Sequence, residues 1–221
     1  MWLSLAAGVA LAAGTANPAP RFLALGDSYT IGEAVAPAQR WPQQLITRLR
    51  EDGIAIADPQ IVAVTGWTTD ELSAGMDAAT LVPPYDLVSL SIGVNNQYRG
   101  RDPENYRREF TALLQRAIAL AGRRAQRVFV VSIPDWGATR FGIESGRDVA
   151  TIARELDAFN AINREEAARE HVAWADVAAI SRAAGATAAE LAEDGLHPSG
   201  RQYTAWLTTI LPAARTALSS P

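Results

Sequence analysis

Two side chains in this sequence are suited to covalent chemistry, a serine that can attack and a histidine that can take its proton. Ser28 lies in the run from Gly26 to Tyr29, directly after a short apolar stretch. A serine hydroxyl is a weak nucleophile, so it needs a base, a group that orients the base, and donors for the negative charge that forms. The chain has only two histidines, His171 and His197, which limits the search for that base.

His197 is the better candidate base of the two. His171 follows a long polar helical pattern and is interpreted as a solvated residue at a helix end. His197 lies in a turn-rich segment, three residues after Asp194, and this spacing allows the carboxylate to reach an imidazole nitrogen. Such a contact would select the tautomer and stabilise the imidazolium. The alternative is an aspartate that caps the following helix beside an exposed histidine.

Two further residues can supply donors to a developing oxyanion. Gly66 follows one predicted strand, and a glycine allows its backbone N–H to come close to a ligand. Asn95 follows another, and its side-chain amide is a donor. Each could instead be an ordinary turn or loop residue. Because Ser28, Gly66 and Asn95 follow separate strands, we expect them to meet at one edge of a parallel sheet.

The elements that must position these residues alternate between strand and helix. Short apolar runs predict strands at Phe22–Leu25, Ile61–Val64, Leu87–Ile92, Val128–Ile133 and Val172–Ala175. Helical periodicity predicts helices at Trp41–Glu51, Asp70–Ala78, Pro103–Ala121, Val149–Arg169 and Ser199–Leu218. This alternation indicates an α/β fold with a parallel sheet covered by helices on both faces.

Composition excludes several classes of protein. The chain has 221 residues, which favours a single domain, here 17–221, and its net charge of −4 offers no basic face for nucleic acid. It has no cysteine, which rules out disulfides and thiolate metal sites. With only two histidines, we expect no metal and no cofactor.

The first residues resemble an export signal. Trp2 to Ala13 is an apolar stretch of small residues, and Gly14 to Ala16 resembles a signal-peptidase site, although a basic first region is missing. We therefore expect residues 1–16 to be a signal peptide and the protein to be secreted or periplasmic, with a cytoplasmic location as the alternative. The stretch is too short for a permanent membrane anchor.

Taken together, the motifs resemble those of the SGNH hydrolases, also called GDSL-type esterases and lipases. The run from Gly26 to Tyr29 is similar to the first sequence block of that family, Gly66 to the second, Gly93 with Asn95 to the third, and the stretch from Asp194 to Pro198 to the fifth. The blocks occur in the family's order and span most of the chain.

The resemblance implies a three-layer α/β/α flavodoxin-like domain with a parallel sheet of about five strands, and hydrolysis of carboxylic esters without a metal. It implies Ser28 as nucleophile, His197 as base, Asp194 as its orienter, and the Ser28 N–H, Gly66 N–H and Asn95 side chain as the oxyanion hole. Two positions depart from the family pattern. Tyr29 replaces a commoner leucine, and Asn96 replaces the usual aspartate of the third block.

The substrate is less defined than the chemistry. We expect a small-molecule ester with a short acyl chain, and a carbohydrate O-deacetylase, a lysophospholipase or a thioesterase are alternatives on the same site. Tyr29, Trp67, Asn96 and Trp136 are the residues that we expect at the substrate pocket; Trp41, Tyr98 and Phe141 either line it or pack helices on the sheet. A non-catalytic binding module and a phosphate-sensing receiver domain are alternative interpretations of the same fold. A receiver usually needs a lysine, however, and this chain has none.

Overall fold

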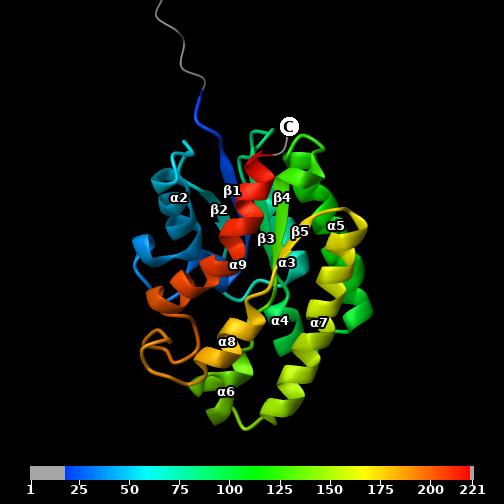
Figure 1. The fold of residues 1–221 in the computed structure, drawn as a ribbon. Helices are drawn as coiled ribbons and strands as arrows, with labels where there is room; N and C mark the ends of the chain where they lie inside the picture. The colour runs from blue at the N-terminus through cyan, green and yellow to red at the C-terminus, as the bar shows by residue number, and fades with distance from the viewer. Residues whose placement is uncertain (1–17, 220–221) are drawn as a thin grey trace, which may run out of the picture.

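A parallel β-sheet runs through the centre of the protein (Figure 1). The computed structural model describes residues 18–219. Within that range the sheet has five strands in the order β2-β1-β3-β4-β5, namely β1 (Phe22–Gly26), β2 (Gln60–Ala63), β3 (Leu87–Ser91), β4 (Val128–Val131) and β5 (Ala173–Ala175). All neighbours are parallel. The five strands predicted from the sequence are confirmed, with ends that differ by two residues or fewer.

The strand order creates a natural binding crevice. The chain leaves β1 toward β2 on one side and then crosses back to β3 on the other, so the order reverses between β1 and β3. Ligands of open α/β sheets bind outside the carboxyl ends of the strands at such a point. Gly26 at the end of β1 is paired with Ser91 at the end of β3, so the loops after these two strands start side by side.

Helices cover both faces of the sheet, as predicted. They are α2 (Trp41–Glu51), α3 (Thr69–Ala78), α5 (Pro103–Leu120), α7 (Val149–Arg169) and α9 (Gly200–Ser219). Figure 1 shows α9 in front of the strands, and α2 packs against it, while α5 lies between α3 and α7 in the other layer. The expected three-layer α/β/α arrangement is therefore confirmed.

The central strands and their helices share one apolar core. All five residues of β1 and of β3 are buried, as expected for strands that are covered on both faces. Trp41 packs with Phe22 and Phe129 at ring-centroid distances of 6.4 Å. Trp41 is thus a core residue that joins α2 to the sheet, which settles the choice left open by the sequence in favour of packing.

Helix α5 begins at a cap that its own sequence supplies. The side chain of Asp102 accepts a hydrogen bond from the Asn105 N–H at 2.8 Å, which caps the helix, and Pro103 occupies the first helical position. The apolar residues on one face of the helix are buried, namely Tyr106, Phe110, Leu113, Leu114 and Ala117. Burial of this face fixes α5 against the sheet.

Short helices after the strands escaped prediction. They are α1 (Ser28–Ile31), α4 (Val94–Tyr98), α6 (Arg140–Glu144) and α8 (Ala178–Ala184). Each is too short to show a helical period, so the sequence indicated loops. Asn95, expected directly after a strand, lies in the first turn of α4.

In the described part of the chain, no helix is long and apolar enough to cross a membrane. Residues 18–219 also contain no group of three or more His, Asp or Glu residues placed to hold a metal ion. The signal peptide predicted for residues 1–16 lies outside the described residues.

Candidate active site

Ser28 lies where β1 turns into α1. Gly26 ends the strand, and a side chain there would come within 2.1 Å of the Thr30 hydroxyl oxygen and 2.6 Å of the Ser91 carbonyl oxygen. Asp27 caps α1 by accepting the Tyr29 N–H at 3.0 Å. Ser28 is then the first residue of the helix, where a backbone N–H has no helical acceptor. The tight turn and the cap therefore present Ser28 at the carboxyl edge of the sheet.

Asp27 is a buried carboxyl group beside this serine. Its residue is 2% exposed, and burial raises its pKa from 3.8 to about 7, although hydrogen bonds from backbone N–H groups oppose the shift. The cap on α1 needs only an oxygen acceptor, which both protonation states of the carboxyl provide. Asp27 can therefore change its charge near neutral pH without loss of the turn.

His197 and Asp194 meet across one tight turn. The His197 Nδ1 lies 2.6 Å from the Asp194 Oδ2, while the Asp194 Oδ1 accepts the N–H groups of Leu196 at 2.9 Å and His197 at 3.0 Å. Burial opposes ionisation of Asp194, but the hydrogen bonds from these three donors hold the pKa of this carboxyl below its ordinary value. Because a carboxylate only accepts, the His197 proton lies on Nδ1 and Nε2 is left with a free lone pair.

The segment that carries this pair is held from several sides. The Ala192 N–H donates to the His197 carbonyl oxygen at 2.8 Å, and the Phe141 N–H donates to the Gly195 carbonyl oxygen at 3.0 Å. Gly195 has a φ of +71°, a conformation that favours glycine. The imidazole of His197 packs on the ring of Tyr29 at a centroid distance of 5.0 Å. His197 is 5% exposed, so these contacts fix a largely buried imidazole.

The candidate oxyanion donors also occupy defined places. Gly66 has a φ of +86°, in a turn closed by a hydrogen bond of 3.2 Å from the Trp67 N–H to the Val64 carbonyl oxygen. The Asn95 Nδ2 donates to the Trp67 carbonyl oxygen at 2.9 Å, and its second N–H stays available because an amide nitrogen carries two. Across residues 18–219, the N–H groups of Ser28 and Gly66 have no hydrogen-bond acceptor.

One cavity brings the reactive residues together. It has a volume of about 240 Å³ and is lined by Ser28, Tyr29, Val94, Asn95, Tyr98, Trp136, Phe141, Leu196 and His197. Asp194 lies behind His197, and Gly66 lies outside the lining. A larger groove of about 420 Å³ lies between α2 and α9 and contains none of the predicted site residues.

Comparison with known proteins places the chain in a family. Residues 24–205 match the sequence model of the GDSL-like Lipase/Acylhydrolase family. The chain belongs to this family. GDSL-type acylhydrolases are carboxylic ester hydrolases, so the chain is a member of an enzyme family, as its motifs predicted. A search of curated protein sequences gave no match.

Solved structures show the same fold. TesA has a TM-score of 0.70 and 22% identity over 90% of this chain and 99% of its own. The lipase/acylhydrolase from Enterococcus faecalis has a TM-score of 0.67 and 20% identity over 90% of this chain and 95% of its own. The acetylxylan esterase Axe2 from Geobacillus stearothermophilus has a TM-score of 0.65 and 18% identity over 91% and 95%. At these identities the likeness concerns the fold alone.

In this GDSL-type chain, the cavity wall is built from aromatic and aliphatic side chains. The indole N–H of Trp136 donates to the Gln97 Oε1 at 2.7 Å, and the Gln97 amide donates to Glu155 at 2.6 Å. Trp136 is 1% exposed, whereas Tyr98, whose ring packs edge-on against it at 5.3 Å, is 48% exposed. The wall is therefore fixed at Trp136 and open to solvent at Tyr98.

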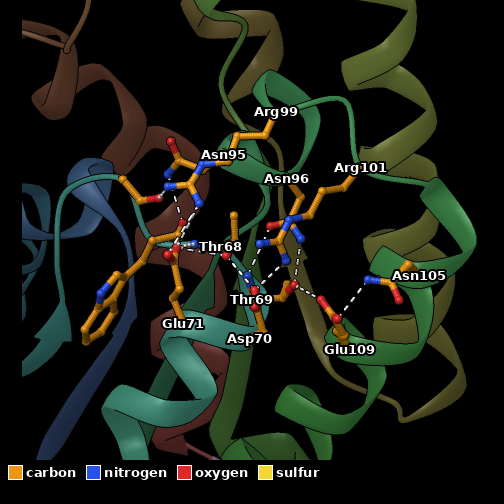
Figure 2. Close-up of polar contacts among 12 residues, drawn as sticks. Thr68, Thr69, Asp70, Glu71, Asn95, Asn96, Arg99, Arg101, Asn105 and Glu109 are labelled. Atoms are coloured by element: carbon orange, nitrogen blue, oxygen red, sulfur yellow. Dashed lines mark hydrogen bonds and ion pairs between the residues drawn. The ribbon is translucent and has the colours of Figure 1, made fainter.

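Two residues that we expected at the pocket lie elsewhere. The ring of Trp67 packs on α3, where a side chain at Gly75 would come within 2.1 Å of it. Asn96 is fully buried, accepts the Thr69 N–H at 3.1 Å and donates to the Thr69 hydroxyl oxygen at 2.7 Å (Figure 2). Both residues follow a strand, but their side chains turn away from the cavity. Tyr29 and Trp136 do line it.

The sequence did not single out Val94 and Leu196. Each is the chain neighbour of a predicted site residue, Asn95 or His197, and each lines the cavity. Their position next to a predicted site residue was the signal that could have identified them as cavity residues. Tyr98 and Phe141, left between pocket and core by the sequence, also line the cavity.

Proposed function

We propose that this protein hydrolyses carboxylic esters with short acyl chains through a covalent acyl-enzyme on Ser28. The observation that carries the proposal is the single cavity lined by Ser28, Asn95 and His197, with Asp194 on the far nitrogen of the imidazole. A nucleophile, an oriented base and an amide donor at one cavity are the parts that acyl transfer requires.

The first step is acylation. The Ser28 Oγ attacks the ester carbonyl carbon while the His197 Nε2 takes the hydroxyl proton, and Asp194 stabilises the resulting imidazolium. The carbonyl oxygen becomes an oxyanion that accepts hydrogen bonds from the Ser28 N–H, the Gly66 N–H and the Asn95 amide. The tetrahedral intermediate collapses, the bond to the leaving alcohol breaks, and that alcohol receives the proton from His197.

The second step is deacylation. Water attacks the acyl-enzyme carbonyl carbon while His197 takes its proton, and a second tetrahedral intermediate forms on the same oxyanion donors. Its collapse breaks the bond to the Ser28 Oγ, which recovers a proton from His197, and the acid is released. Every proton in the cycle passes through one imidazole, so the chemistry needs no metal and no cofactor.

The cavity supports a short acyl group. If each non-hydrogen atom takes about the 30 Å³ that a water molecule occupies in the liquid, then 240 Å³ holds roughly eight such atoms. Val94, Trp136 and Phe141 give this space an apolar lining, which suits an aliphatic chain. We therefore place the acyl chain against Trp136 and the alcohol toward solvent.

An acetyl ester of a carbohydrate is the second candidate substrate. Tyr98 lies at the cavity and is 48% exposed, so its ring offers an apolar face to a sugar while its hydroxyl stays in water. A panel of p-nitrophenyl esters of increasing chain length, with acetylated xylose, a lysophospholipid and an acyl thioester beside it, separates these substrate classes. Turnover that peaks at acetate and extends to the sugar favours the carbohydrate ester, and a peak at butyrate or hexanoate favours the aliphatic ester.

The chemistry is tested with a fluorophosphonate probe and the variant Ser28→Ala. We expect the probe to label the wild-type protein at Ser28, as mapped by mass spectrometry, and we expect Ser28→Ala to lose both labelling and turnover of p-nitrophenyl butyrate. Ser73→Ala is the control, since Ser73 lies on α3 outside the cavity. Turnover by Ser28→Ala near the wild-type rate would refute the acyl-enzyme, and absence of labelling in the wild type would favour a non-catalytic binding module.

We also propose that residues 1–16 direct export and are removed, in accordance with their apolar, small-residue composition. N-terminal sequencing of the protein recovered from a bacterial host tests this. A mature chain that begins near Asn17 would support export, and an intact Met1 in the cytoplasm would refute it.

A further inference from the structure

The loop that carries Gly66 is joined to α4 by a row of polar contacts (Figure 2). Two of them, from Asn95 to the Trp67 carbonyl oxygen and between Asn96 and Thr69, are described above. A third comes from Arg99, at the carboxyl end of the same helix, whose Nη2 donates to the Gly66 carbonyl oxygen at 2.7 Å. Side chains of α4 and of its C-terminal cap therefore hold the stretch from Gly66 to Thr69, which leads from the turn into α3. One of these side chains, Asn95, is itself a proposed oxyanion donor.

The contact from Arg99 acts on a peptide that has few other restraints. Gly66 has no side chain, and its φ of +86° is one of several conformations that a glycine adopts at little cost. The peptide that follows Gly66 is fixed on its N–H side by the bond from Trp67 to the Val64 carbonyl oxygen, and on its carbonyl side by Arg99. Without the guanidinium, within the part of the chain that the structure describes, this peptide is held only by the bond from the Trp67 N–H. Rotations about the two flexible backbone bonds of Gly66 can then change the direction of the preceding peptide, which carries the Gly66 N–H.

Arg99 is itself held in place. Its Nη1 lies 3.3 and 3.4 Å from the two carboxylate oxygens of Glu71. The same carboxylate accepts the Thr68 N–H at 2.8 Å and the Thr68 hydroxyl at 2.9 Å, which caps α3. The rigid fork of a guanidinium can bind a carboxylate and a carbonyl at once. Arg99 therefore ties the turn at Gly66 to the fixed end of a helix.

We propose that Arg99 is a positioning residue for the oxyanion hole, which keeps the Gly66 N–H aimed at the developing charge. This inference rests on the proposed function. The ordinary alternative is a surface ion pair, and the side chains of Arg99 and Glu71 are 42% and 41% exposed. An exposed pair contributes little to stability, so a purely structural Arg99 could be removed with little effect on catalysis. A positioning Arg99 instead affects the rate.

The experiment compares Arg99→Ala and Arg99→Lys with Arg101→Ala. Arg101 is a matched control, because it makes the neighbouring ion pair to Asp70 at 2.5 Å and, among the described residues, forms no hydrogen bond with the turn around Gly66. We measure kcat and KM with p-nitrophenyl butyrate. An oxyanion donor typically provides a rate enhancement of about 100- to 1,000-fold, and a donor that is displaced by up to about one ångström loses part of it. We therefore expect Arg99→Ala to lower kcat about 10- to 100-fold, with KM within about 2-fold of wild type.

Two further readouts separate positioning from a general loss of structure. Free guanidinium ion, at concentrations well below those that denature, should raise kcat of Arg99→Ala several-fold and leave Arg101→Ala unchanged. Arg99→Lys, which keeps a single donor, should give an intermediate kcat. If Arg99→Ala does not fold, Arg99→Lys is compared with Arg101→Lys: a kcat several-fold lower supports positioning, and an equal kcat refutes it.

The outcome is independent of the test of the chemistry. Absence of fluorophosphonate labelling in the wild type would remove the proposed function. Labelling and turnover in the wild type, with Arg99→Ala and Arg101→Ala equal in kcat, would leave that function intact and overturn the inference about Arg99.

Discussion

The buried pair of Asn96 and Thr69 permits a prediction that the structure makes quantitative. The Asn96 amide donates to the Thr69 hydroxyl oxygen at 2.7 Å, and the single proton of that hydroxyl is donated to the Glu109 carboxylate. The Glu109 carboxylate also accepts from the Asn105 amide at 2.8 Å. Donation thus runs in one direction, from Asn96 through Thr69 to the carboxylate of Glu109. Figure 2 shows these three side chains in a row.

Asn96→Asp restores the residue that is usual in the family and is expected to destabilise this chain. Its carboxylate would replace a donor with an acceptor, so that two carboxylates compete for the one proton of Thr69. A buried polar group without a partner costs about 1–3 kcal/mol, and more when it is charged. Asn96 is fully buried, so we expect a loss of about 2–4 kcal/mol in the free energy of unfolding. At about 2–4 °C per kcal/mol for a chain of this size, the melting temperature falls by roughly 5–15 °C.

The double variant Asn96→Asp with Glu109→Gln reverses the direction of the chain of hydrogen bonds. The introduced carboxylate accepts both the N–H and the hydroxyl of Thr69, and the introduced amide donates to the Thr69 hydroxyl oxygen while its oxygen accepts from Asn105. We expect the two changes to be coupled favourably by about 0.5–3 kcal/mol, the range for residues that share a hydrogen-bond network.

The assay is urea unfolding followed by tryptophan fluorescence for the wild type, both single variants and the double variant. Glu104→Gln is the control partner, because Glu104 lies on the same helix with its side chain 68% exposed, and it pairs with Arg107. Asn96→Asp with Glu104→Gln should be additive within about 0.5 kcal/mol. Equal additivity for the Glu109 pair would refute the argument that Thr69 couples the two positions.

Two further predictions concern the carboxyl groups beside the reactive residues. Because burial raises the pKa of Asp27 from 3.8 to about 7, the native state binds the proton more tightly, and this group's contribution to stability is lost as pH rises from about 4 to about 7. Asp27→Asn keeps an oxygen for the cap on α1 but cannot ionise. The unfolding free energy of the wild type minus that of the variant should therefore fall by about 4 kcal/mol between about pH 4 and pH 7. Urea unfolding of both proteins across this pH range tests the prediction, and a difference that does not change with pH contradicts it. Asp194→Asn should lower kcat on the order of 1,000- to 10,000-fold. The N–H groups of Leu196 and His197 already bind the oxygen at this position, so the introduced amide nitrogen faces His197 Nδ1 and donates to it. The ring proton then lies on Nε2, which can no longer accept the proton of Ser28. Turnover of p-nitrophenyl butyrate within tenfold of the wild type, with an unchanged circular dichroism spectrum, would show that Asp194 does not set the tautomer.

The strands and the five long helices of this fold were predictable because each carries its signal locally. Strand β3 is an unbroken apolar run, and helix α5 combines an apolar stripe with the Asp102 cap and Pro103. The short helices α1 and α4 carry no such signal, because their residues are set by tertiary contacts. The first turn of α4 is shaped by Gly93, whose φ is +128° and whose missing side chain makes room for the ring of Tyr106. A contact between residues thirteen apart in the chain leaves no periodic pattern.

The same limit applies to the site. Strand ends pointed to Ser28 and Asn95, and the turn-rich segment after Asp194 pointed to His197; all three line one cavity. The position of a residue at a strand end does not predict the direction in which its side chain points. Trp67 and Asn96 both follow strands, yet Trp67 packs on Gly75 and Asn96 pairs with Thr69, because each finds its partner on α3. The direction of a side chain after a strand is a property of the neighbouring layer.

The two departures from the family pattern are each matched by a neighbour that is distant in the chain. The Tyr29 ring lies between His197 and Trp206, at centroid distances of 5.0 and 6.3 Å, and the Tyr203 hydroxyl donates to the Tyr29 carbonyl oxygen at 3.1 Å. Helix α9 therefore supports the residue on which the imidazole packs. Asn96 is matched by Glu109 on α5 through the hydroxyl of Thr69. Tyr29 is thus supported by α9 on one face of the sheet, and Asn96 by α5 on the other.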